Sequence, residues 1–118
     1  MHEFSLSEGL VKAVLEEMSR LAPTVVLLRA HVVVGALHRV TPESLRLAYE
    51  LQTRDTRAAG SFLDVTLVPE AVLCGDCGWQ GESEDPLPAC ERCSGTNLTR
   101  LKGMELYLSD LEVEDPET

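Results

Sequence analysis

Basic side chains are scarce in this sequence of 118 residues, which has ten Lys and Arg against twenty Asp and Glu and a formal net charge of -10. A surface this acidic repels a polyanion, which argues against nucleic acid as a partner. No apolar run approaches the ~20 residues that span a bilayer, and the first residues lack the basic stretch and apolar run of a secretory signal. We therefore expect a cytoplasmic protein with no membrane partner.

Catalytic motifs are also missing. His2-Glu3 is not followed by a second histidine, since position 6 is Leu6, which excludes a metalloprotease helix, and no nucleophile elbow occurs. The sequence has no Gly-rich phosphate loop, so a nucleotide-hydrolysing partner would have to supply any energy that its function needs. We predict that the protein is not an enzyme.

Cysteine occurs only as two Cys-x2-Cys pairs separated by twelve residues. In a chain that is not exported this spacing indicates a metal site rather than disulfides, because cytosolic reductants keep thiols reduced. Four thiolates complete a closed tetrahedron that suits Zn²⁺, and iron sites share the spacing. We predict a structural zinc site, with dithiol redox chemistry as the weaker alternative. The ligands would be Cys74, Cys77, Cys90 and Cys93.

Hydrophobic periodicity in the first third of the chain predicts one helix and one strand. The helix is expected from Leu6 to Leu21, with Ser5 to Glu8 as its capping box and Pro23 as its stop. The first four residues would then project from its start. A strand rich in β-branched residues follows over 24–34, with alternate residues on its apolar face: Val26, Leu28, Ala30, Val32 and Val34.

A second helix and two more strands are expected further along. Thr41-Pro42-Glu43 supplies a cap, a proline and an early acid, and opens a short helix. Strands are predicted over 62–68 and 104–108, and residues 112–118 are predicted to be a frayed tail. The residues expected to face inward from the second helix are Leu45, Ala48, Tyr49 and Leu51.

These elements predict an α+β fold, in which two helices accompany a small mixed three-stranded sheet in the order α-β-α-β…β. Residues 70–98 hold the four cysteines but have too few apolar side chains for a core of their own, so a bound metal would be needed to stabilise this segment. We therefore expect an α/β domain of residues 1–69 plus 99–118, with residues 70–98 as an inserted zinc-ribbon-like domain.

The amino terminus of the α/β domain supplies nitrogen ligands that suit a second metal ion. Methionine aminopeptidase needs a small second residue, so His2 should leave Met1 and its free amine in place. The Met1 amine, the His2 imidazole and the backbone amides of His2 and Glu3 can form chelate rings with the in-plane nitrogen geometry that Ni²⁺ or Cu²⁺ prefers. These groups must lose protons to bind, so affinity should fall on mild acidification. The competing interpretation is that His2 is merely an exposed residue near a frayed end.

Short segments along nearly the whole chain form a recognisable pattern. They are Met1-His2-Glu3 before an apolar helix, Val34-Gly35-Ala36-Leu37, Val40-Thr41-Pro42-Glu43-Ser44-Leu45, Gly60, Val68-Pro69, the two cysteine pairs and Gly103-Met104-Glu105-Leu106. This pattern resembles the HypA/HybF family of hydrogenase-maturation nickel metallochaperones. The resemblance implies Ni²⁺ as transient cargo at Met1, His2 and Glu3, with structural Zn²⁺ at the four cysteines.

The resemblance also implies partners. The family is understood to deliver nickel to the precursor of the [NiFe]-hydrogenase large subunit together with the GTPase HypB, and in some bacteria to urease with its maturation factors. The alternative from cysteine spacing alone is an acidic zinc-ribbon adaptor that binds proteins and has no nickel function. Residues 70–91 contain six acids and no Lys or Arg, which argues against a nucleic-acid-binding ribbon.

Overall fold

The computed structural model describes residues 2–116 and forms two compact units. The helical unit comprises the residues up to Val32, Val40–Thr66 and the residues from Tyr107 onward, and the cysteine unit comprises Val33–Arg39 and Leu67–Leu106. The elements are α1 (His2–Met18), β1 (Val26–Gly35), a short 3-10 helix η1 (Ala36–His38), α2 (Pro42–Thr53), β2 (Phe62–Val68), β3 (Glu70–Cys74), β4 (Gln80–Ser83), β5 (Leu98–Lys102) and β6 (Leu106–Glu114).

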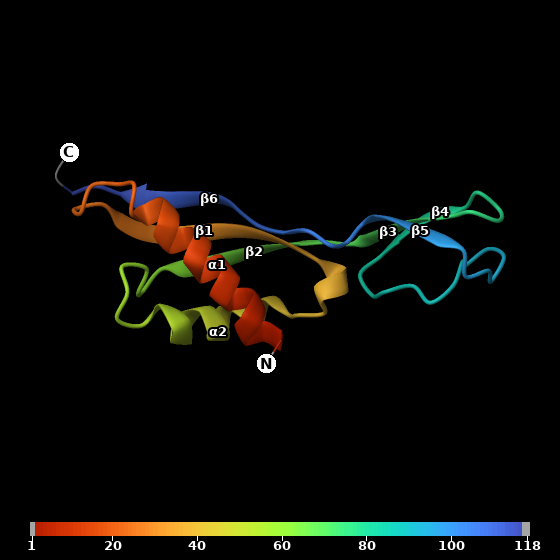
Figure 1. Cartoon of the computed structure of the whole chain (residues 1–118), viewed down its shortest axis with the longest axis horizontal. Coiled ribbons are helices and arrows are strands. Elements are labelled where there is room, and N and C mark those ends of the chain that lie inside the picture. The colour runs from red at the N-terminus through yellow and green to blue at the C-terminus, as the bar shows by residue number, and fades with distance from the viewer. Residues whose placement is uncertain (1, 117–118) are drawn as a thin grey trace. The chain divides into compact units, whose positions relative to one another are not determined.

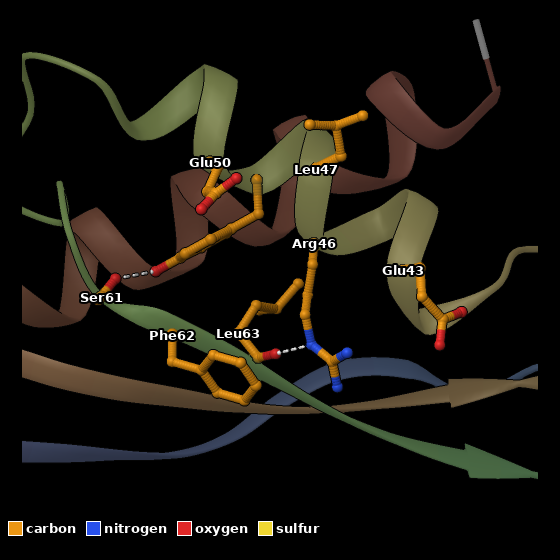
Figure 2. A pocket seen from close by; sticks show the side chains of 8 residues that line it. Glu43, Arg46, Leu47, Glu50, Ser61, Phe62 and Leu63 are labelled. Atoms are coloured by element: carbon orange, nitrogen blue, oxygen red, sulfur yellow. Dashed lines mark hydrogen bonds between the residues drawn. The ribbon is translucent and has the colours of Figure 1, made fainter.

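The helical unit is built on a three-stranded sheet with the order β2-β1-β6. Strands β1 and β2 run in the same direction and β6 in the opposite one, so the predicted mixed sheet is confirmed (Figure 1). The two helices lie on the same side of the strands (Figure 2). Apolar side chains between helices and sheet form the core: Leu10, Val11, Val14, Met18, Leu27, Ala30, Val32, Leu45, Ala48, Tyr49 and Leu63.

The first helix begins and ends earlier than the sequence predicted. Helix α1 starts at His2, so the capping box at Ser5 is wrong and residues 2–4 do not project ahead of the helix. An acid in the first turn, Glu3, favours this start through the helix dipole. The helix ends at Met18 rather than at the predicted Leu21, whose side chain is exposed.

The early end of α1 is explained by Arg57, which comes from the loop after α2. Its guanidinium donates hydrogen bonds to the backbone carbonyls of Met18, Leu21, Ala22 and Val25. These carbonyls lie at and just beyond the helix end, where backbone acceptors lack intrahelical donors and a positive charge is favourable. A residue about forty positions away therefore caps α1, and local sequence patterns carry no sign of it.

The second helix begins as predicted. The Thr41 hydroxyl accepts a hydrogen bond from the Ser44 amide, 3.1 Å away, and Pro42 opens the helix. Leu45, Ala48 and Tyr49 are buried, but the prediction for Leu51 is wrong, since its side chain is 39% exposed. The buried apolar face of α2 is thus narrower than the sequence predicted.

Two polar contacts tie α2 to β2 across an open groove of about 290 Å³ (Figure 2). The Arg46 Nε atom donates to the Leu63 carbonyl oxygen at 2.9 Å, and the guanidinium lies over the Phe62 ring. The Tyr49 and Ser61 hydroxyl oxygens are 2.7 Å apart. Because the Ser61 hydroxyl donates to the Ala58 carbonyl, Tyr49 is the donor between them.

Strands β1 and β6 differ from their predictions in detail. In β1, Leu27 is buried while Val26 and Leu28 are exposed, so the expected alternation holds only from Ala30 onward. Strand β6 runs to Glu114 rather than ending at 108, which makes the predicted frayed tail wrong for residues 112–114. Its end is held by neighbours across the sheet, since Arg29 pairs with Glu112 at 3.3 Å.

The cysteine unit contains a second three-stranded sheet with the order β4-β3-β5, which the sequence analysis did not predict. Both pairings are antiparallel, with Val72 opposite Gly81 on one side and Arg100 on the other. Glu70, at the start of β3, is buried, and its carboxylate accepts from the Leu87 amide at 2.7 Å and the Arg100 Nε atom at 3.2 Å. Glu70 therefore holds the segment that leads to the second cysteine pair.

Candidate metal centre

Two turns of the same design carry the four cysteines. In the first, the Gly78 amide donates to the Cys74 carbonyl, and in the second, the Ser94 amide donates to the Cys90 carbonyl, both at 2.9 Å. The residue after each second cysteine is left-handed, with φ of 80° at Gly78 and 64° at Ser94. Glycine takes this conformation without strain, whereas Ser94 does so at a cost that the turn must offset.

The four sulfur atoms converge on one point. All lie within 4.8 Å of one another, with Cys74 Sγ 3.7 Å from Cys93 Sγ and Cys77 Sγ 3.6 Å from Cys90 Sγ. Zinc–sulfur bonds of about 2.3 Å would place the corners of a regular tetrahedron about 3.8 Å apart. The sulfur spacing therefore fits a closed four-thiolate zinc site, with each turn contributing one sulfur to each close pair.

Backbone amides point at two of the sulfurs. The amides of Arg92 and Cys93 both donate to Cys90 Sγ at 3.3 Å, and the Gly95 amide donates to Cys93 Sγ at 3.4 Å. Burial raises the pKa of the Cys90 thiol, but the two amides outweigh it and lower that pKa to about 7. The Gly95 amide lowers the pKa of Cys93, yet its neighbouring cysteine sulfurs raise it overall.

The chain also brings a cation to this centre. The Arg92 guanidinium donates to the Cys77 carbonyl oxygen at 2.6 Å, which links the second turn to the first. A metal ion with four thiolates carries a net negative charge, so a nearby guanidinium is electrostatically favourable. Neither Arg92 nor Glu70 was foreseen in the sequence, because both act on backbone groups that only the folded turns bring close.

The other predicted site lies at the start of α1. His2 is exposed in the first turn, Glu3 is half-buried, and Met1 lies outside the described residues. The first amides of a helix have no intrahelical acceptor. The other two histidines have partners of their own: His31 Nδ1 lies 2.7 Å from Asp64 Oδ2, and His38 Nε2 lies 3.1 Å from the Met104 carbonyl oxygen.

Comparison with known proteins decides the family. A family model described as "Hydrogenase/urease nickel incorporation, metallochaperone, hypA" matches residues 1–113. This chain belongs to the HypA family. It is therefore a metallochaperone for nickel incorporation in hydrogenase maturation, and the prediction that it is not an enzyme is confirmed. The predicted nickel agrees with the description of the family, and the four-cysteine cluster agrees with the predicted zinc.

Individual members of the HypA family match over almost the full chain. The hydrogenase maturation factor HypA of Acidithiobacillus ferrooxidans is 38% identical over 114 residues, which cover 97% of this chain and 100% of the relative. That of Rhodobacter capsulatus is 33% identical over 113 residues, covering 96% and 99%. The solution structure of the Ni metallochaperone HypA from Helicobacter pylori shares the fold, with a TM-score of 0.58 at 23% identity over 95% of this chain and 97% of that one.

No helix in residues 2–116 has the length and apolar character required to cross a bilayer.

Proposed function

We propose that this member of the HypA family binds Ni²⁺ reversibly at its amino terminus, through the Met1 amine, the His2 imidazole and the amides of His2 and Glu3. The observation that carries the proposal is the start of α1 at His2. Because the first helical amides have no intrahelical acceptor, losing their protons to a metal removes no donor from the hydrogen bonds of the helix. An exposed His2 can then join them.

Release follows from the same ligands. The amine and the imidazole bind nickel only in their neutral forms, and each coordinated amide gives up its proton. Nickel uptake therefore releases protons, and mild acidification should drive nickel off. This provides a chemical route to transfer that needs no large movement of the fold.

We propose further that Cys74, Cys77, Cys90 and Cys93 hold structural zinc. The sulfur spacing and the two matching turns support a closed site. When bound, the metal would cross-link the two turns that the segment 78–89 separates. A closed site with four protein ligands leaves no position for substrate, which favours a structural role over a catalytic one.

We propose that this protein acts in the cytoplasm and that its partners are the GTPase HypB and the precursor of the [NiFe]-hydrogenase large subunit. Urease maturation factors are proposed as a second set of partners. The description of the matching family names both hydrogenase and urease. The chain has no phosphate loop of its own, so a nucleotide-hydrolysing partner would complete the delivery step.

Calorimetric titration with Ni²⁺ tests the terminal site in zinc-loaded, untagged protein with an intact Met1. We expect one nickel per chain, lost in His2→Ala and in a chain lengthened by a glycine before Met1. His31→Gln is the matched control and should bind normally, because His31 contacts Asp64 in the sheet. Equal binding by all four proteins, or no binding at all, would favour the acidic zinc-ribbon adaptor instead.

A further inference from the structure

The interface between α1 and α2 contains polar groups that neither metal site explains. The Gln52 Nε2 atom, on α2, donates to the Phe4 carbonyl oxygen of α1 at 3.0 Å. Within the part of the chain that the structure describes, two side-chain atoms are buried without a hydrogen-bond partner: Gln52 Oε1 and Ser7 Oγ. Ser7 is 0% exposed. Such atoms are costly to bury unpaired, so their placement calls for an explanation.

The two unpaired atoms are chemically complementary. A serine hydroxyl has a proton to donate, and Gln52 Oε1 can accept it. Phe4 and Ser7 are three residues apart on α1 and so lie on the same face of the helix. The Gln52 amide therefore contacts α1 through its nitrogen, at the Phe4 carbonyl, and a hydrogen bond from the Ser7 hydroxyl to its oxygen, absent from this structure, would add a second contact on the same face.

We propose that Gln52, together with Ser7, is a positioning residue for the nickel-binding terminus. The hydrogen bond from Gln52 to the Phe4 carbonyl fixes α1 at Phe4, directly behind the residues that would chelate the metal. This proposal rests on the proposed function of the terminus. The amides of His2 and Glu3 lie ahead of the fixed point and have no intrahelical acceptor, while the helix behind them is already ordered. Less ordering is then required when nickel binds.

The test compares Gln52→Met with Tyr49→Phe in zinc-loaded protein. Gln52→Met keeps the length of the side chain and removes its donor and acceptor. Tyr49→Phe removes one buried hydrogen bond from the same helix, the one to Ser61, and is the matched control. For Gln52→Met we expect faster hydrogen exchange of the amides of residues 4–8 without metal, and nickel affinity weaker by about two- to tenfold, the equivalent of one hydrogen bond. Tyr49→Phe should change neither quantity.

Ser7→Ala tests the pairing itself. If the hydroxyl pairs with Gln52, Ser7→Ala lowers stability, and the double variant with Gln52→Met loses less than the sum of the two single variants. If the Ser7 hydroxyl is unpaired, its removal is neutral or stabilising, and the pairing is refuted.

The readouts separate this inference from the proposed function. If nickel binding depends on His2 but Gln52→Met matches Tyr49→Phe in affinity and exchange, only the positioning role is refuted. If nickel binding proves independent of His2, the proposed function fails, and the role of Gln52 in nickel positioning fails with it. Faster exchange at residues 4–8 in the metal-free variant would then still establish Gln52 as an anchor of the helix.

Discussion

Gly35 packs directly against the backbone of Gly103 and Met104 in the cysteine unit. Its amide donates to the Glu105 carbonyl at 2.7 Å, and the Leu37 amide donates to the Gly103 carbonyl at 3.0 Å. A Cβ atom at position 35 would lie 2.0 Å from the Gly103 carbonyl oxygen and 2.7 Å from the Met104 nitrogen. Both obstacles are backbone atoms, so no side chain can turn aside to relieve the clash.

Gly35→Ala should therefore force the two backbone segments apart by more than an ångström in total. That movement weakens both hydrogen bonds, each contributing about 1 kcal/mol, and adds an overpacking cost of about 1–3 kcal/mol. We expect the free energy of unfolding to fall by roughly 3–5 kcal/mol. Urea denaturation of zinc-loaded protein, followed by the fluorescence of Trp79, measures this change in the same unit.

The control for Gly35→Ala is Gly9→Ala in helix α1. A Cβ at position 9 would meet nothing within 4 Å, and alanine is the better helix former, so this variant should gain about 1 kcal/mol as judged by helical circular dichroism. An unchanged midpoint for Gly35→Ala would refute the close approach.

Further predictions concern the cap, the buried acid, the metal and the tyrosine. Arg57→Met removes the cap of α1 and should cost about 2–3 kcal/mol in thermal or urea unfolding, whereas a surface cation such as Lys12→Met should cost almost nothing. Glu70→Gln keeps an acceptor for the Leu87 amide and should lower the free energy of unfolding by about 1 kcal/mol, since the lost partner Arg100 is half-exposed. Glu70→Leu leaves the Leu87 amide without an acceptor and should cost about 2–3 kcal/mol more. Equal losses of stability in the two variants would contradict this account. Chelating the metal should speed hydrogen exchange at residues 75–97 and leave the exchange of α1 and α2 unchanged. Burial raises the pKa of Tyr49, and the hydrogen bond with Ser61 partly offsets this. The contribution of Tyr49 to stability is therefore complete below pH 10.0 and is lost as the pH rises through the higher folded pKa. In Tyr107→Phe, tyrosinate absorbance should develop only at that higher pH.

Local signals in the sequence predicted the parts of the fold that local chemistry decides. The start of α2 follows from Thr41 and Pro42, whose capping and backbone angle act within one turn. Both Cys-x2-Cys pairs form tight turns that bring the four sulfurs together, because the hydrogen bond that closes each turn spans four residues. The family pattern in the sequence is likewise confirmed by the match over residues 1–113.

The errors arise where distant residues decide. Helix α1 ends where Arg57 caps it, so counting apolar residues toward Pro23 placed the end too late. Residues 112–118 were predicted to fray because they are acidic and nothing apolar follows Val113, yet pairing beside β1 extends the strand to Glu114. The sheet of the cysteine unit was missed because its strands are only four or five residues long and hold few apolar side chains. The division into domains 1–69 plus 99–118 and 70–98 stays a prediction.

The place of β6 at the edge of the first sheet has a consequence for synthesis on the ribosome. Its contacts reach back across most of the chain: Ser109 donates to the His31 carbonyl 78 residues earlier, and Thr24 donates to Asp115 91 residues later. The third strand of that sheet therefore leaves the ribosome after all four cysteines have emerged. Contacts of such long sequence separation form late, because a long loop must close first. The cysteine turns can thus collect their metal while the helical unit still waits for its closing strand.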